Sequence, residues 1–327
     1  MAANVALTAA GYDVEFDPYR EQLEKDSKML WSLPWDDFIN AWKTSPPAIP
    51  PGCPSLDEID VSHEDVTVSD GEKVDVQIYR PKGGASVLPL VYVMHGGGWV
   101  VGSHGIEEAM NRSVCVKNQA PAYKFPIATT DSYDVLQWCR DNATRLSIDT
   151  TKIIIGGGSA GGNLAATLCL RLRDEGKLSG VLGQVLNIPV TCHYKLLDEA
   201  AKRFPDQKFD SYEENKDAYL VDREKMIWFW DKYTTKPESN PYASPLLASS
   251  HANLPPTLIQ VAALDPLRDE GLAYGAALKA AGVPVTVNSY AGLPHGFYSI
   301  PTLTQTPRYH DAVVEFVTKL LENKSHL

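Results

Sequence analysis

From about residue 56 onward, short apolar runs in this chain alternate with amphipathic segments. Alternating apolar and polar positions on either side of Asp70-Gly71 predict a β-hairpin with strands at 64–69 and 74–80. Four further apolar runs predict buried strands, at residues 88–94, 153–155, 183–189 and 257–261. Helical patterns separate these runs, so the chain is expected to be an α/β protein whose mostly parallel sheet is covered by helices on both faces.

Two segments depart from this alternation. The first is residues 1–55, where an amphipathic pattern predicts a helix from Tyr19 to about Leu30, with Asp17 as a candidate N-cap, a second helix at 35–42 and a proline-rich linker after it. The second is residues 192–250, which are rich in charged and aromatic side chains. Both segments are therefore expected to lie outside the central sheet.

The pentapeptide Gly157-Gly158-Ser159-Ala160-Gly161 stands between a β-branched run and a helix-forming stretch. Strand, G-x-S-x-G and helix together form the context in which a serine becomes a nucleophile, because the glycines allow a sharp turn that exposes the hydroxyl. The helix that follows directs its unpaired N–H groups toward the same position. Ser159 is therefore the candidate nucleophile.

The partners that such a serine needs occur elsewhere in the chain. Asp265 follows the strand at 257–261 and His295 lies further downstream, so the chain order is Ser, Asp, His, which is typical of α/β-hydrolases. Asp269 and Glu270 compete with Asp265 as the acid, but they fall inside the next predicted helix, where they would complement the helix dipole. Asp265 is favoured because it lies nearest the end of its strand.

A glycine triplet follows the strand at 88–94, in the motif His95-Gly96-Gly97-Gly98-Trp99. Consecutive glycines at a strand end let backbone N–H groups approach a ligand closely, as an oxyanion hole requires.

These motifs resemble those of the hormone-sensitive-lipase family of α/β-hydrolase esterases. H-G-G-G-W, G-x-S-A-G-G-N-L and D-x-L-R-D-E match in the right order, and the similarity extends from about Val66 to the C-terminus. The resemblance implies an α/β-hydrolase domain at 56–327 with a cap insertion at about 192–250, and an N-terminal helical cap segment with its linker at 1–55. The implied roles are nucleophile, general base and orienting acid for Ser159, His295 and Asp265, with oxyanion donors at the amides of Gly97, Gly98 and Ala160.

The predicted activity is that of a serine carboxylesterase that hydrolyses short-acyl esters through an acyl-enzyme, without a cofactor. The expected partner is a small-molecule ester. Within the cap insertion, Trp228 and Trp230 are candidate substrate-binding residues, although aromatic side chains at such spacing also pack helices together.

A second class of function arises from the same glycines, since Gly156, Gly158 and Gly161 also form G-x-G-x-x-G, a dinucleotide-binding motif. That class needs an acidic residue at the end of the following strand. Here Asp174 and Glu175 end a helix instead, and the strand at 183–189 ends without an acid. The dinucleotide-binding class is therefore disfavoured.

Composition narrows the choice of partners. A net charge of −11 opposes binding to nucleic acid or to an anionic membrane, and no apolar run reaches membrane-spanning length. The five cysteines show no metal-ligand spacing and indicate a reducing compartment, so no metal site is expected. The cytoplasm is the expected location, with the peroxisome as the alternative because Ser325-His326-Leu327 resembles a peroxisomal address. The sequence leaves the oligomeric state unassigned.

One stretch departs from the family pattern. Relatives carry a helix and then a central strand between the glycine triplet and the helix predicted at 129–146. Only residues 103–119 are available here before Ala120, which is about 10 residues too few at ordinary element lengths. Either Ser113–Val116 serves as a stunted strand or the strand is absent. The alternative function is therefore a ligand-binding or weakly active protein with a hydrolase fold.

Overall fold

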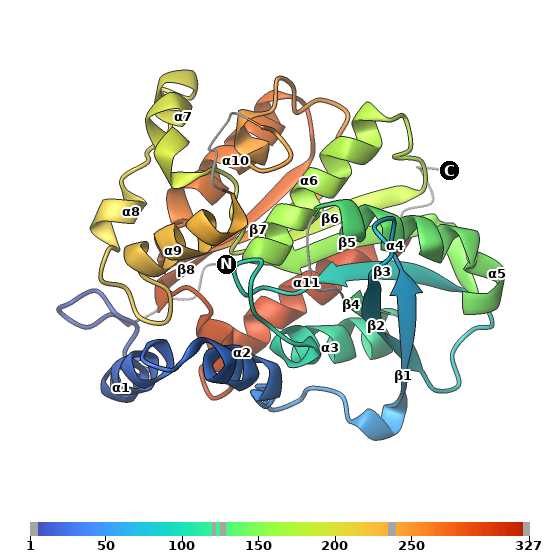
Figure 1. Ribbon diagram of the computed structural model, residues 1–327, viewed down its shortest axis with the longest axis horizontal. Coiled ribbons are helices and arrows are strands. Elements are labelled where there is room, and N and C mark those ends of the chain that lie inside the picture. Colours follow the sequence, from blue (N-terminus) through green and yellow to red (C-terminus); the bar gives the residue numbers. More distant parts are fainter. Residues whose placement is uncertain (1–5, 120–121, 125–128, 235–239, 323–327) are drawn as a thin grey trace.

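The computed structural model describes residues 6–119, 122–124, 129–234 and 240–322, and within these ranges one sheet has eight strands in the order β1-β2-β4-β3-β5-β6-β7-β8 (Figure 1). The strands are β1 (Ile59–Thr67), β2 (Lys73–Pro81), β3 (Leu88–Met94), β4 (Ala122–Lys124), β5 (Ile148–Gly158), β6 (Val181–Asn187), β7 (Thr257–Leu264) and β8 (Val285–Pro294). Strand β2 is antiparallel to both of its neighbours, and the strands from β4 to β8 are parallel to one another. The α/β-hydrolase fold is thus confirmed, including the predicted hairpin of β1 and β2.

The helices surround this sheet. They are α1 (Arg20–Trp31), α2 (Trp35–Thr44), α3 (Glu108–Asn118), α4 (Thr129–Asp141), α5 (Ala143–Leu146), α6 (Ala160–Asp174), α7 (Leu197–Arg203), α8 (Ser211–Glu214), α9 (Arg223–Tyr233), α10 (Arg268–Ala280) and α11 (Gln305–Glu322). None of them, among the residues described, is both long enough and apolar enough to cross a lipid bilayer.

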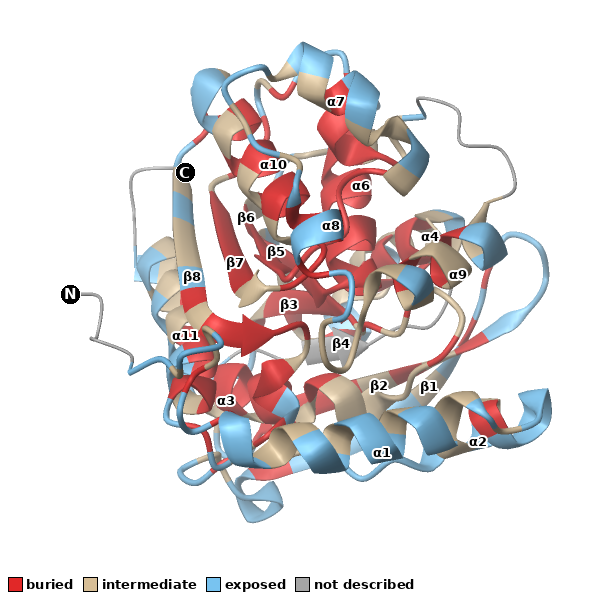
Figure 2. Ribbon diagram, turned by 90° about the vertical axis from the view of Figure 1, so that its left-hand side faces the viewer, coloured by how far each residue is buried: buried red, intermediate tan, exposed pale blue. Residues whose placement is uncertain are grey.

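The sheet is buried on both faces, as Figure 2 shows for its central strands. Successive side chains of a strand point to opposite faces. In β3, Leu90 and Tyr92 accordingly pack in the core beneath α4, α6 and α10, whereas Val91 and Val93 pack against α3 and α11. This double burial explains why the central strands are continuous apolar runs.

The central strand that seemed to be missing is present as β4, between β2 and β3. It pairs with Gln77, Ile78 and Tyr79 of β2 and with Val91 and Tyr92 of β3. The expectation that the strand is absent is therefore wrong, and so is the placement of a strand at Ser113–Val116. That stretch belongs to α3, because Ser113, Val114 and Cys115 are buried on the helix face that packs against the sheet and α11.

The N-terminal helices pack against the segment at 192–250. In Figure 1, α1 and α2 (blue) lie at the lower left, below α8 and α9. The Trp31 ring of α1 lies 5.2 Å from the Trp228 ring and 5.7 Å from the Phe229 ring of α9, measured between centroids. The two segments that depart from the alternating pattern therefore contact each other through aromatic side chains.

Two sequence expectations concern the N-cap of α1 and the C-terminal tripeptide. The assignment of Asp17 as an N-cap is wrong, because Asp17 begins a short 3-10 turn with Pro18, α1 begins at Arg20, and the carboxylate forms an ion pair with Arg20 at 2.6 Å. The tripeptide Ser325-His326-Leu327 lies outside the described residues.

Candidate active site

Ser159 lies at the tight turn between β5 and α6. Its backbone has φ 54° and ψ −118°, a sparsely populated region for a residue with a side chain, which costs on the order of 1–3 kcal/mol. The flanking glycines make this turn possible. A Cβ atom at Gly157 would lie 2.3 Å from the carbonyl oxygen of Gly161, and one at Gly161 would lie 2.0 Å from that of Met94. The backbone of α6 thereby packs directly against the end of β3, and this contact holds the serine in place.

His295 and Asp265 come to Ser159 from the ends of two neighbouring strands. Asp265 follows β7, and its Oδ2 lies 2.7 Å from His295 Nδ1. His295 follows β8, and its Nε2 lies 3.0 Å from Ser159 Oγ. The second carboxylate oxygen, Oδ1, accepts the backbone N–H of Leu267 at 2.9 Å, which fixes the carboxylate plane. All three side chains are buried, so the structure brings together the three residues selected from the sequence.

The two competing acids have other partners. Glu270 Oε1 accepts the backbone N–H of Cys192 at 3.1 Å as well as that of Thr191 at 2.6 Å, and Asp269 Oδ2 accepts that of Ser211 at 2.9 Å. Burial raises the pKa of Glu270 well above its usual value, although the N–H groups that it accepts oppose the rise. Both acids therefore attach the 192–250 segment to α10. The sequence analysis missed this role, because a helix position alone does not reveal a partner distant in the chain.

The glycine triplet folds back toward Ser159. A Cβ atom at Gly96 would lie 3.4 Å from the Cβ atom of Ser159, so the two segments are in contact. Gly97 and Gly98 have φ values of 118° and 60°, which other residues adopt only with strain. Ala160 is the first residue of α6, and the amide at that position has no acceptor within the helix.

The glycine loop, Ser159 and His295 line one cavity of about 340 Å³. Much of its apolar wall comes from the two segments outside the sheet, namely Leu23, Leu30 and Trp31 on one side and Leu220, Val221, Met226 and Phe229 on the other, and Ile106, Ala109 and Tyr298 also line it. This volume lies at the lower end of the range for small-molecule sites, about 300–1,000 Å³.

Neither Trp228 nor Trp230 lines this cavity. Trp230 is fully buried, with ring contacts of 4.6 Å to Trp99 and to His193, and Trp228 packs against Trp31 at 5.2 Å. Consecutive residues of a helix point about 100° apart, so only Phe229 of these three aromatic residues faces the cavity. The two tryptophans that the sequence offered as substrate-binding residues thus lie outside the cavity beside Ser159.

His310 of α11 also lines the cavity, and sequence reasoning did not select it. Burial lowers the pKa of this imidazole to about 4. Neither ring nitrogen has a hydrogen-bond partner among the described residues. Its position on an amphipathic helix resembles that of any core residue, and only the three-dimensional packing places it at the cavity.

Comparisons with known proteins agree with this fold. A family model described as an alpha/beta hydrolase fold matches residues 90–299. The versiconal hemiacetal acetate esterase of Dothistroma septosporum is 33% identical, covering 84% of this chain and 85% of that protein. The ethyl acetate hydrolase of Pseudomonas putida is also 33% identical, covering 75% and 78%. The crystal structure of a thermostable esterase from Pseudomonas putida superposes with a TM-score of 0.80 at 30% identity, covering 96% of this chain and 98% of that one.

Proposed function

We propose, from the premise that this chain belongs to the hormone-sensitive-lipase-like esterases of the α/β-hydrolase fold, that Ser159, His295 and Asp265 carry out its ester hydrolysis. The chain is a carboxylic ester hydrolase, as its relatives are. The observation that carries the proposal is the continuous series of contacts from Ser159 Oγ through the imidazole to the buried carboxylate, at 3.0 Å and 2.7 Å.

The proposed reaction has two steps. In the first, His295 Nε2 accepts the proton of Ser159 as Oγ attacks the ester carbonyl carbon, and the same nitrogen then gives that proton to the departing alcohol. Asp265 accepts the hydrogen bond from Nδ1–H and stabilises the imidazolium that forms. In the second step, water loses a proton to His295 and attacks the acyl-enzyme, which releases the acid and restores the serine.

The amides of Gly97, Gly98 and Ala160 are the proposed donors to the oxyanion. Gly97 and Gly98 support this proposal because they line the same cavity as Ser159, and Ala160 supports it because it begins the helix that directly follows Ser159. Removing one donor of this kind typically costs about 100-fold to 1000-fold in turnover.

The proposed substrates are small esters with short acyl groups. The modest volume of the cavity and its apolar wall support this class. Two relatives are named for acetate esters, which agrees in acyl size. We further propose that residues 1–55 and the insertion at 192–250 together form the cap that closes this cavity, since each contributes to its wall.

Hydrolysis of p-nitrophenyl esters of increasing acyl length tests both parts of the proposal. For the wild type we expect kcat/KM to be greatest for the shortest chains and to fall as the chain lengthens. Ser159→Ala should reduce kcat by about 10³-fold or more with the fold intact. Ser299→Ala is the matched control, because Ser299 lines the same cavity but lies outside the proposed triad.

The two parts of the proposal, the nucleophile and the short-acyl preference, can be refuted separately. Activity near that of the wild type in Ser159→Ala would refute the nucleophile. A rate that rises with acyl length would refute only the short-acyl class.

A further inference from the structure

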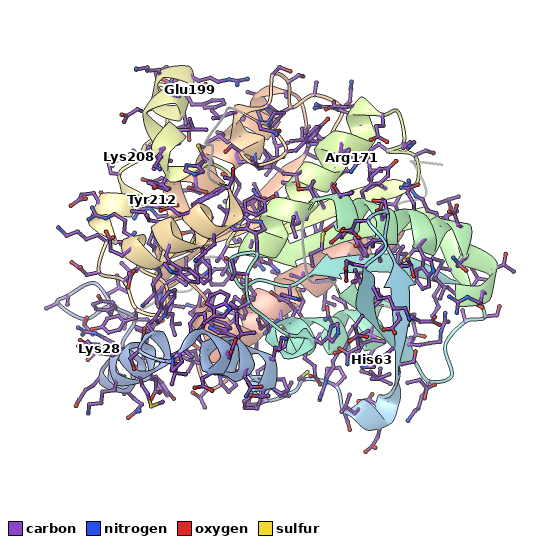
Figure 3. All side chains as sticks on the ribbon, viewed as in Figure 1. Lys28, His63, Arg171, Glu199, Lys208 and Tyr212 are labelled. Carbon is purple, nitrogen blue, oxygen red and sulfur yellow. The ribbon has the colours of Figure 1, made fainter. Side chains whose placement is uncertain are left out.

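A cluster of two histidines and one aspartate lies outside the cavity of the proposed active site, although Gly105 and Ile106, which follow His104, line that cavity. His63 belongs to β1, Asp75 to β2 and His104 to the short 3-10 helix η3 (His104–Glu107). In Figure 3, His63 lies toward the right of the molecule, whereas Lys28 and Tyr212, from the two segments that form the cavity wall, lie at the left. None of the three residues lines the cavity beside Ser159.

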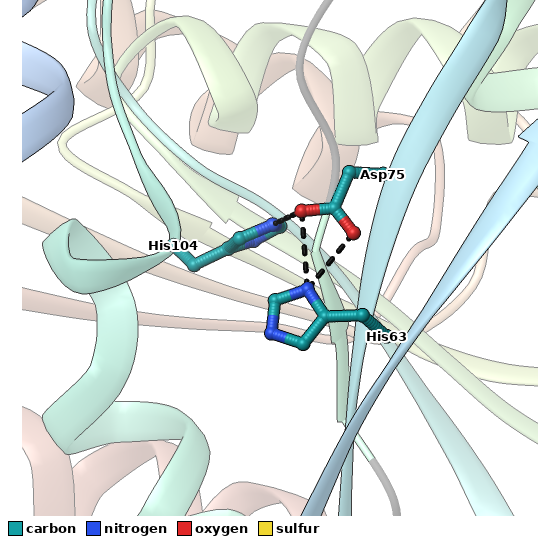
Figure 4. A group of neighbouring side chains, drawn as sticks. All are labelled: His63, Asp75 and His104. Carbon is teal, nitrogen blue, oxygen red and sulfur yellow. Dashed lines mark hydrogen bonds and ion pairs between the residues drawn. The ribbon is translucent and has the colours of Figure 1, made fainter.

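The three side chains converge on one point (Figure 4). His63 Nδ1 lies 2.9 Å from Asp75 Oδ1 and 3.1 Å from Oδ2, and His104 Nε2 lies 2.8 Å from Oδ2. The possible ligand atoms all lie within 4.8 Å of one another. Four ligands in a tetrahedron around Zn²⁺, at about 2.1 Å from the ion, are about 3.4 Å apart. Shifts of these ligand atoms by roughly 1 Å or less would therefore place them at the distances that a tetrahedral Zn²⁺ ion requires.

The protonation of the imidazoles is compatible with coordination. A neutral imidazole that donates an N–H to Asp75 can present the same nitrogen to an ion once its proton moves to the other ring nitrogen. On the far side of the His63 ring, the amide nitrogen of Gln77 lies 3.4 Å from Nε2. The amide oxygen of Gln77 accepts the Tyr79 hydroxyl at 2.8 Å, and a half-turn of the amide would offer this oxygen to an Nε2–H instead, which is the kind of support that metal-bound histidines commonly have.

We propose that His63, Asp75 and His104 bind a divalent transition metal ion of the Zn²⁺ class. Two imidazole nitrogens and one carboxylate oxygen suit such ions, whereas Mg²⁺ and Ca²⁺ prefer sites made of oxygen alone. The side chains of His63 and Asp75 are about half exposed, which leaves room for water or a further ligand to complete the coordination. The ligands lie 12 and 29 residues from Asp75, so no compact motif revealed them in the sequence.

The ion would join the β1–β2 hairpin to the end of the glycine loop. His104 follows the loop that carries Gly97 and Gly98, and this loop is tightly packed: a Cβ atom at Gly102 would lie 2.5 Å from the His95 ring. A bound ion would therefore stabilise the folded chain and restrain this loop from outside the cavity.

Isothermal titration with ZnCl₂ on tag-free protein, together with melting temperatures in EDTA and in ZnCl₂, tests the proposal. We expect one tight site per chain, at least 10-fold weaker in His63→Gln and in His104→Gln, and a rise in melting temperature with Zn²⁺ that both variants lose. Asp60→Asn is the matched control, because this exposed acid of β1 pairs with Lys82 at 4.0 Å and lies opposite Arg80 rather than opposite a residue of the cluster. His295→Gln should keep the tight site, which separates it from zinc bound at the proposed active site.

Three results would overturn the proposal. They are the absence of any site tighter than millimolar in the wild type, equal affinity in the wild type and both histidine variants, and an equal rise in melting temperature with Mg²⁺ or Ca²⁺. Melting in EDTA shows whether each variant is folded, so weaker binding cannot arise from unfolding unnoticed.

Discussion

His310 should make the folded protein sensitive to acid. The side chain is 5% exposed, and burial lowers its pKa to about 4. The nearby charges of Asp311 and Lys117 act in opposite directions, and the Tyr298 and Tyr309 rings contact the imidazole at 6.3 Å and 5.5 Å. Because the folded pKa lies below the unfolded value near 6.5, the unfolded chain takes up a proton first as the pH falls. Stability is therefore complete above about pH 6.5 and is lost toward pH 4.

The size of this loss follows from the two pKa values. Each pH unit between them is worth about 1.4 kcal/mol, so a folded value of about 4 and an unfolded value of about 6.5 correspond to about 3 kcal/mol once both states are protonated. At pH 4.5 most of this difference, about 2.5 kcal/mol, has already been lost. A loss of that size is a large part of the stability of an ordinary domain.

The substitution His310→Phe removes the titrating group and leaves no ring nitrogen without a partner. Urea unfolding of the wild type and the variant at pH 7 and at pH 4.5 gives four free energies of unfolding. The difference between the proteins at pH 7 is the internal reference, because it contains every effect of the new side chain except titration. We expect this difference to shift in favour of the variant by about 2–3 kcal/mol at pH 4.5.

A change below about 0.5 kcal/mol would refute the reasoning. His193, whose pKa burial also lowers to about 4, remains in both proteins and contributes equally to each.

Three further outcomes are expected. Burial raises the pKa of Glu270, so the folded protein loses stability as the pH rises and this carboxyl group must ionise. The free energy of unfolding of Glu270→Gln, measured in urea, should therefore increase relative to that of the wild type between pH 5 and pH 8. A constant difference between the two proteins would contradict this. Gly98→Ala should reduce kcat/KM about 100-fold or more, because the new Cβ atom would lie 2.1 Å from the Phe229 ring, whereas Gly176→Ala, also at positive φ but with open space around it, should keep full activity. Inserting about 10 residues before Ala120 should raise both the melting temperature and the esterase rate, and equal values would show that the short segment suffices.

Most of the sheet could be predicted because its strands are buried on both faces. The apolar run at 88–94 coincides with β3, and the runs at 153–155, 183–189 and 257–261 fall within or overlap β5, β6 and β7. A strand that packs helices on both sides has no polar face, so it stands out as a continuous run. The site residues could be predicted for the same reason. Ser159 directly follows β5, Asp265 directly follows β7 and His295 directly follows β8.

The features that the sequence analysis missed depend on where an element packs and which way its side chains point, and the hydrophobic periodicity of the sequence does not specify either. The sequence alone does not distinguish which of three consecutive aromatic residues, Trp228, Phe229 and Trp230, lines the cavity. The packing of α9 against its neighbours determines that Phe229 does. The segment before β4 illustrates the same limit. Its residues could form either a helix or a strand, and burial of Ser113–Cys115 against the sheet and α11 decides for the helix.

The contact between Gly98 and Phe229 has a consequence for how substrate enters. Phe229 occupies the space that a side chain at residue 98 would need, so the glycine loop and α9 fit together only while both keep their present positions. The same ring forms part of the cavity wall. A movement of α9 that widens the cavity would therefore remove the packing that supports the proposed oxyanion donors. On this reasoning, Phe229→Ala should widen the range of acyl lengths accepted and at the same time lower kcat for the shortest ester, and a wider range with unchanged kcat would show that the loop keeps its shape without the ring.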